Sequence, residues 1–124
     1  GVMVSEAMKA ADRLQEEGVS VAVINARFVK PLDKTLIREI AQKVKCLITV
    51  EEGCRMGGFG SAVLEFLSEE ECWGMPTKVL GLPDWYIEQG PQDLLREKYG
   101  LTADGIYDQV KALYDRVSLQ AVIR

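Results

Sequence analysis

The chain has 124 residues, the length of one domain or of a piece of one. Its 15 Lys and Arg residues and 19 Asp and Glu residues give a formal net charge of −4 at pH 7, which argues against a nucleic-acid partner because such domains usually carry a basic surface. The hydrophobic fraction of 48% and the charged fraction of 27% are ordinary for a globular domain, and neither supports disorder. No apolar run approaches the roughly 18 residues of a membrane-spanning helix, so we expect no membrane contact.

Histidine is absent, and three cysteines stand at Cys46, Cys54 and Cys72. The absence of histidine excludes Ser-His and Cys-His nucleophile pairs and His-dependent zinc sites. Three cysteines without C-x-x-C spacing make neither a disulfide framework nor a four-cysteine zinc site. Free thiols fit a reducing compartment, and the N-terminus shows no targeting signal. We therefore expect a cytoplasmic protein with no metal bound to this chain.

The first part of the chain predicts two helices with a strand between them. Residues 5–17 are predicted to form a helix that ends at Gly18, and the β-branched, apolar residues 19–25 are typical of a buried strand. Asp33 is the expected N-cap of a helix over 34–44. The predicted apolar faces consist of Ala7, Met8, Ala11 and Leu14 in the first helix and Leu36, Ile37, Ile40, Ala41 and Val44 in the second.

The middle of the chain predicts a strand, a helix and a further strand. Residues 46–50 are a second buried strand, and the glycine-rich residues 51–60 connect it to a helix over 61–70. Residues 77–80 are a third, short strand. The inward face of the helix consists of Val63, Leu64 and Leu67.

Two helices close the sequence. Pro91 suits the first turn of a helix that runs to Tyr99 and stops at Gly100. Thr102 caps a last helix. Its core face consists of Ile106, Val110, Leu113 and Val117.

Apolar strands that alternate with helices predict a parallel sheet covered on both faces, which is a three-layer α/β/α architecture. The pattern opens on a helix, whereas such domains usually open on a strand. We therefore expect the chain to begin inside a larger polypeptide.

Candidate functional residues follow the predicted strands, because ligands of open parallel sheets gather at the carboxyl ends of the strands. They are Asn25 and Arg27 after the first strand, Glu51 and Glu52 after the second, and Asp84 after the third.

Two interpretations remain open for the glutamates and for the loop behind them. Glu51 and Glu52 are either a metal or acid/base pair, or they bind loop amides or an arginine of another domain; neighbouring residues of a strand point in different directions, which favours the second interpretation. Residues 57–61, which include Gly58, are either a phosphate cradle at a helix N-terminus or a tight turn. The third glycine of a dinucleotide fingerprint is missing, which favours the turn.

The remaining candidates are a thiol and an aromatic pair. Cys54 lies beside Arg55, which would lower the pKa of its thiol, but no histidine is present to support catalysis. Trp85 and Tyr86 form either a binding platform or an anchor for the loop after the third strand. Taken alone, these residues do not make a catalytic centre.

Three segments together resemble the C-terminal domain of 1-deoxy-D-xylulose-5-phosphate synthase, a transketolase-like enzyme. The middle segment is shared by the wider transketolase group, and the other two point more narrowly to the synthase. The segments are residues 25–33 (NARFVKPLD), residues 49–53 with 57–63 (TVEEG and GGFGSAV), and residues 81–90 (GLPDWYIEQG) with 99–102 and 105–106.

The resemblance implies a homodimeric parent enzyme that condenses pyruvate with glyceraldehyde 3-phosphate, releases carbon dioxide, and uses thiamine diphosphate and Mg²⁺. In this family the preceding domains hold the cofactor, and no diphosphate- or metal-binding motif of the family falls on this chain. The resemblance therefore implies no catalytic, cofactor-binding or metal-binding residue here. It leaves a structural role in which Arg27, Glu51, Glu52, Gly58 and Asp84 contact the preceding domains of the same polypeptide.

The resemblance also implies a mixed five-stranded sheet, of which this chain supplies only the last three strands. The first two, including the normally central one, would precede Gly1. We therefore predict that residues 21–24 and 46–50 either show a gap between them or are pushed into direct pairing.

Two other functions stay open. One is the C-terminal domain of a 2-oxo acid dehydrogenase E1 β subunit, which would bind a partner subunit. The other is a free-standing regulatory module that binds a small anion at residues 57–61.

Overall fold

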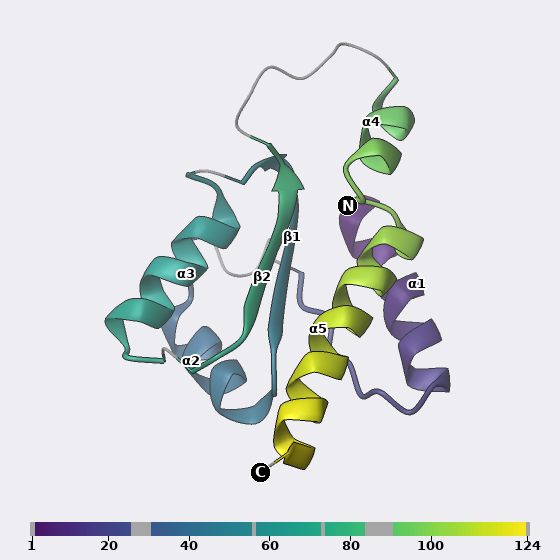
Figure 1. Ribbon diagram of the computed structural model, residues 1–124. Helices are drawn as coiled ribbons and strands as arrows, with labels where there is room; N and C mark the ends of the chain where they lie inside the picture. Colours follow the sequence, from purple (N-terminus) through teal and green to yellow (C-terminus); the bar gives the residue numbers. More distant parts are fainter. Residues whose placement is uncertain (1, 26–30, 56, 73, 84–90, 124) are drawn as a thin grey trace.

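The computed structural model describes residues 2–25, 31–55, 57–72, 74–83 and 91–123. Five helices and two strands lie in this part of the chain (Figure 1). In chain order they are α1 (Val2–Glu16), α2 (Lys34–Lys43), β1 (Leu47–Cys54), α3 (Phe59–Glu69), β2 (Thr77–Leu82), α4 (Gln92–Lys98) and α5 (Ala103–Ile123).

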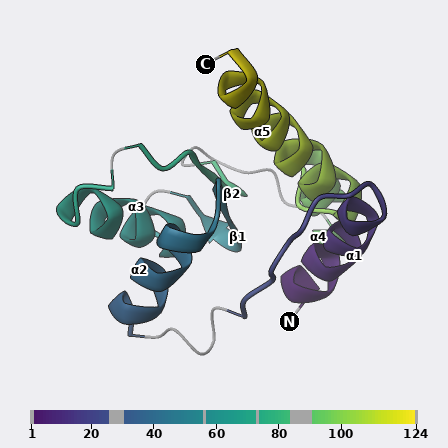
Figure 2. The same ribbon diagram turned by 90° about the horizontal axis from the view of Figure 1, so that it is seen from below.

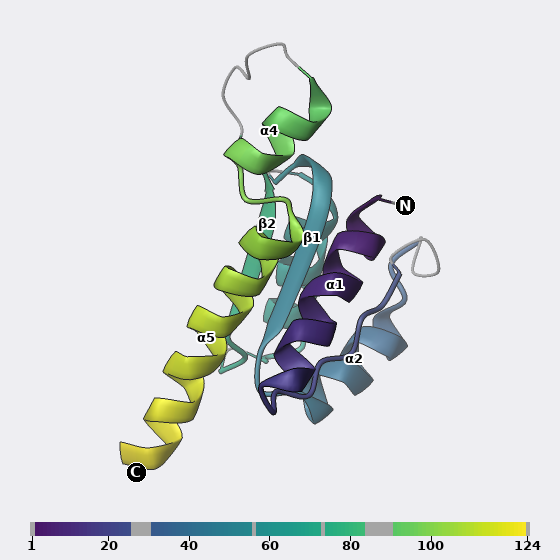
Figure 3. The same ribbon diagram turned by 90° about the vertical axis from the view of Figure 1, so that its right-hand side faces the viewer.

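The elements form three layers with the sheet in the middle. Helices α2 and α3 cover one face of the sheet, and α1 and α5 cover the other (Figures 1 and 2). The short helix α4 lies beyond the carboxyl ends of the strands, as Figure 3 shows from the side. The predicted three-layer α/β/α architecture is confirmed.

The sheet of the described residues consists of β1 and β2, which run parallel. Leu47 pairs with Thr77, and the register continues without interruption to the pair of Val50 and Leu80. Helix α3 connects the two strands. This strand–helix–strand unit is the way in which neighbouring parallel strands are usually joined.

Each face of the sheet has its own hydrophobic core, because successive side chains of a strand point to opposite faces. On the face of α1 and α5, Ile48 and Val50 pack against a buried cluster. This cluster consists of Ala10, Leu80, Leu101 and Ile106. On the face of α2 and α3, Leu47 packs against a second cluster. It consists of Ile37, Val63, Phe66 and Leu67.

The predicted helix ends are confirmed at four positions. The carboxylate of Asp33 accepts a hydrogen bond of 3.0 Å from the backbone N–H of Leu36 at the start of α2. The hydroxyl of Thr102 likewise accepts from Gly105, at 3.1 Å, at the start of α5. Gly18 and Gly100 follow the ends of α1 and α4 with φ of +87° and +73°, the left-handed conformation that favours glycine.

The predicted strand over residues 19–25 is wrong, because this segment is irregular and is not a member of the sheet. Its exposure still alternates from residue to residue: Val19 is buried and Ile24 is 43% exposed. The apolar, β-branched sequence favours an extended chain, but a strand also requires a neighbouring strand to take up its backbone hydrogen bonds. The prediction allowed either direct pairing of residues 21–24 with residues 46–50 or a gap between them. The structure shows no direct pairing of these two segments.

Several smaller expectations also need correction. Met8 and Leu64, predicted to face the core, are 47% and 43% exposed. Helix α3 begins two residues before its predicted start. Strand β1 continues to Cys54, so Glu51 and Glu52 belong to the strand rather than to the connection after it.

Candidate functional site

An irregularity in the sheet sets the geometry at the end of β1. Val50 pairs with Leu80 and Cys54 pairs with Leu82, so three residues of β1 lie opposite the single residue Gly81. Such a bulge bends a strand and turns its side chains in new directions. A Cβ atom on Gly81 would lie 2.8 Å from Cγ of Arg55 and 3.1 Å from the carbonyl oxygen of Gly53, so a side chain here would displace its neighbours.

The carboxylate of Glu51 points to the N-terminus of α3. Its Oε2 accepts a hydrogen bond of 2.8 Å from the backbone N–H of Gly60, and its Oε1 accepts one of 3.2 Å from that of Phe59. The first N–H groups of a helix have no partner within the helix, and their partial positive charge favours an anion. Glu51 therefore caps α3, which is the loop-amide interpretation of this residue.

Glu52 leaves the same bulge in another direction. Its carboxylate lies 3.2 Å from the guanidinium of Arg96 and joins the end of β1 to α4. The side chain of Glu52 is 50% exposed, whereas that of Arg96 is 18% exposed. The two glutamates thus have separate partners, which does not fit a metal or acid/base pair.

The predicted glycine-rich turn is held at both of its ends. The hydroxyl of Ser61 donates a hydrogen bond of 2.6 Å to the carbonyl oxygen of Arg55. The carbonyl oxygen of Gly58, the N-cap of α3, accepts one of 3.1 Å from the N–H of Ala62. Gly60 is buried against the sheet. The turn therefore brings the first residues of α3 close to β1 and β2.

Of the five predicted contact residues, Arg27 and Asp84 lie outside the described residues, as do Trp85 and Tyr86. Glu51, Glu52 and Gly58 lie together at the carboxyl end of β1. Sequence reasoning did not find the partner of Glu52, because no local pattern connects it with Arg96, 44 residues further along the chain.

The start of α3 does not fit the diphosphate of thiamine diphosphate, the cofactor that the family resemblance implies. The two amides that would bind a phosphate oxygen already bind Glu51, and a diphosphate there would be repelled by this carboxylate. Within the described residues, no group of three or more His, Cys, Asp and Glu side chains is placed to hold a metal ion.

Cys46 and Cys72 have free thiols in the described part of the chain. Burial raises the pKa of the Cys46 thiol above its ordinary value, which disfavours the reactive thiolate. Sγ of Cys72 lies 3.8 Å from the carbonyl oxygen of Glu70. The side chain of Cys54 lies outside the described residues.

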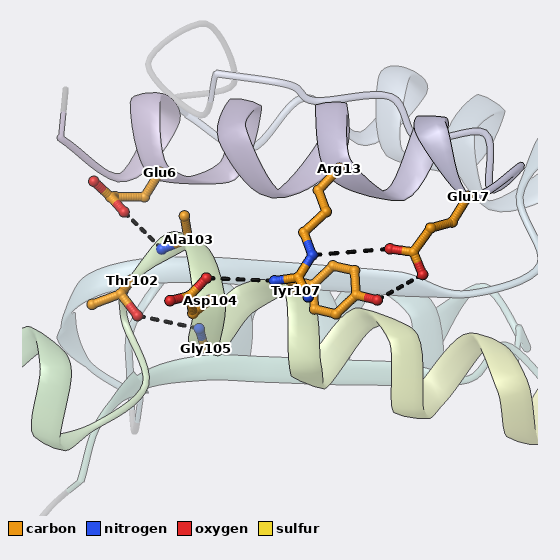
Figure 4. A network of polar contacts seen from close by, with 8 residues as sticks. All are labelled: Glu6, Arg13, Glu17, Thr102, Ala103, Asp104, Gly105 and Tyr107. Carbon is orange, nitrogen blue, oxygen red and sulfur yellow. Dashed lines mark hydrogen bonds and ion pairs between the residues drawn. The ribbon is translucent and has the colours of Figure 1, made fainter.

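A second polar cluster joins α1 to α5 (Figure 4). The guanidinium of Arg13 lies 3.7 Å from the centre of the Tyr107 ring and 3.5 Å from the carboxylate of Asp104. The hydroxyl of Tyr107 donates a hydrogen bond of 2.7 Å to Glu17. This bond, with a contribution from burial and from the charge of Glu17, raises the pKa of Tyr107 above its ordinary value.

At the other end of this cluster, Glu6 accepts a hydrogen bond of 2.6 Å from the backbone N–H of Ala103. A residue of the first helix thus caps the last one. These contacts connect residues about 90 positions apart, and no spacing rule within one helix predicts them.

Comparison with known proteins shows the family of the chain. The family described as "Transketolase, C-terminal domain" matches residues 1–106, and the chain belongs to this family. It is 47% identical over 116 residues to 1-deoxy-D-xylulose-5-phosphate synthase 2 of Geobacter sulfurreducens and 46% identical over 113 residues to the synthase of Aquifex aeolicus. The predicted resemblance is confirmed.

The chain spans 18% of the length of each of these two relatives, and the matches cover 94% and 90% of the chain. A solved structure, "Split gene transketolase, inactive beta4 tetramer", matches with a TM-score of 0.80 and 36% identity. That match covers 91% of this chain and 36% of the other. The fold is therefore that of a transketolase C-terminal domain. In the described part of the chain, each helix is too short or too polar to cross a membrane.

Proposed function

We propose that this chain is the C-terminal domain of a cytoplasmic, homodimeric enzyme that condenses pyruvate with glyceraldehyde 3-phosphate. The products are 1-deoxy-D-xylulose 5-phosphate and carbon dioxide. The observation that carries the proposal is the 46–51% identity to 1-deoxy-D-xylulose-5-phosphate synthases over at least 86% of the chain. Thiamine diphosphate and Mg²⁺ are bound by other domains of the enzyme.

The role of this chain in the enzyme is structural. Its candidate carboxylates are engaged with their own chain: Glu51 binds the amides of α3, and Glu52 lies beside Arg96. The contact with the preceding domains is formed by Arg27, Glu51, Glu52, Gly58 and Asp84. Of these, Glu51 is half-buried. The exposed half of Glu52 supports this placement, because the carboxylate has room for a second partner.

Turnover measurements test the reaction and the structural role separately. The complete enzyme that contains this chain should release labelled carbon dioxide from carboxyl-labelled pyruvate only when glyceraldehyde 3-phosphate, thiamine diphosphate and Mg²⁺ are present. The isolated 124-residue chain should show no turnover. An inactive complete enzyme would contradict the reaction, and an active isolated chain would contradict the structural role.

The proposed contact is tested by Glu52→Gln in two contexts. In the isolated chain this substitution should lower the free energy of unfolding by no more than about 1 kcal/mol, because half-exposed ion pairs contribute little to stability. In the complete enzyme the same change should lower the melting temperature clearly more. The matched control is Glu65→Gln on the exposed surface of α3, which should have equal, small effects in both. Equal effects of Glu52→Gln in the two contexts would place the contact elsewhere.

We also propose that the sheet of this chain is an incomplete part of the domain, and that a strand from the preceding polypeptide pairs with β1. The support is the apolar segment 19–25, which alternates in exposure as a strand does but is not in the sheet. The short share of the relatives' length is consistent with a preceding polypeptide.

The second candidate function is the same domain on a separately encoded subunit, as in the 2-oxo acid dehydrogenase E1 β subunits. The support is that a protein described as a split-gene transketolase has a domain that matches 91% of this chain with a TM-score of 0.80. The length of the natural polypeptide distinguishes the two. A single chain of the size of the synthases supports the first function, whereas a separate gene for the cofactor-binding signature supports the second.

A further inference from the structure

We draw no further inference here: the strongest candidate, the N-terminus of α3, where the backbone amides of Phe59 and Gly60 converge near the buried hydroxyl of Thr49, carries nothing because the carboxylate of Glu51 already accepts both hydrogen bonds and no other observation in the described residues points to a ligand there.

Discussion

Tyr107 makes a contact whose strength depends on pH. Its phenol donates a hydrogen bond to the carboxylate of Glu17, and the folded chain therefore favours the protonated phenol and raises its pKa. A group whose pKa is raised on folding contributes its full stabilisation below its pKa in the unfolded chain, about 10 for tyrosine. The contribution is lost as the pH rises through the higher pKa of the folded chain.

We expect Tyr107→Phe to lower the free energy of unfolding at pH 8, and the difference from the parent chain to shrink above about pH 10. Urea unfolding at a series of pH values measures this difference. Absorbance titration of the phenols gives an independent reading, in which Glu17→Gln should move the pKa of Tyr107 back toward its ordinary value. A difference between the chains that does not change with pH would contradict the assignment.

Glu51 shows how one side chain can decide between two functions of a motif. A glycine-rich turn before a helix is compatible with phosphate binding, but here the helix amides bind a carboxylate of the same chain. The sequence contains both the turn and the glutamate. The bulge opposite Gly81, which directs the glutamate to the turn, could not be predicted from the sequence.

At the scale of the elements, the approach of α3 to the sheet depends on Gly60. A Cβ atom at this position would lie 2.5 Å from Oγ1 of Thr49 and 2.5 Å from Cγ1 of Val79. Thr49 is only 6% exposed, and its hydroxyl has no hydrogen-bond partner among the described residues. Helix and strand are therefore packed too closely here for any side chain.

We expect Gly60→Ala to destabilise the chain by roughly 1–3 kcal/mol, the usual cost of forcing extra volume into a packed core. The matched control is Gly74→Ala, because a Cβ atom on Gly74 has no neighbour within 4 Å among the described residues. It should change stability by less than about 0.5 kcal/mol. Chemical denaturation of both variants measures the two effects, and similar values for them would mean that α3 can move away from the sheet without loss.

For the whole molecule, the helices could be predicted well and the sheet only in part. Helices α1 and α2 could be predicted from local sequence features, because each has an apolar stripe and a capping residue at one end, Gly18 for α1 and Asp33 for α2. A strand is stable only beside another strand. Residues 19–25 have a sequence as suitable for a strand as that of β1, but β1 has β2 as a neighbour and residues 19–25 have no such place in the sheet.

The same distinction applies to the candidate site. The position of Glu51 and Glu52 at the carboxyl end of a strand followed from the order of the elements. The partners of the two glutamates could not be predicted in this way. Whether each carboxylate reaches α3 or α4 depends on the bulge and on Arg96, which lies far along the chain. The contact between Arg13 and Tyr107, at the centre of the cluster between α1 and α5, could not be predicted either, because the two residues lie far apart in the sequence.

The proposed missing strand makes a prediction for the whole domain. When the chain is extended by the residues that precede it in its reading frame, the amides of residues 19–25 and of β1 should exchange with solvent more slowly. Backbone hydrogen bonds within a sheet protect amides from exchange. The amides of α3 serve as the internal control, since its core exists in both forms. Unchanged exchange along residues 19–25 would contradict the proposal.

The pairing of α1 with α5 also has a consequence for the time at which the chain folds during synthesis. The hydrogen bond between Glu17 and Tyr107 joins residues 90 positions apart. At the usual rate of about 5–20 residues per second, Glu17 is made roughly 5–18 s before Tyr107. The face of the sheet beneath α2 and α3 is complete earlier, because α2, β1, α3 and β2 all precede α5 in the chain. We expect the growing chain to pass through a stage in which that face is assembled while Leu14 and its neighbours on α1 still lack the helix that will cover them.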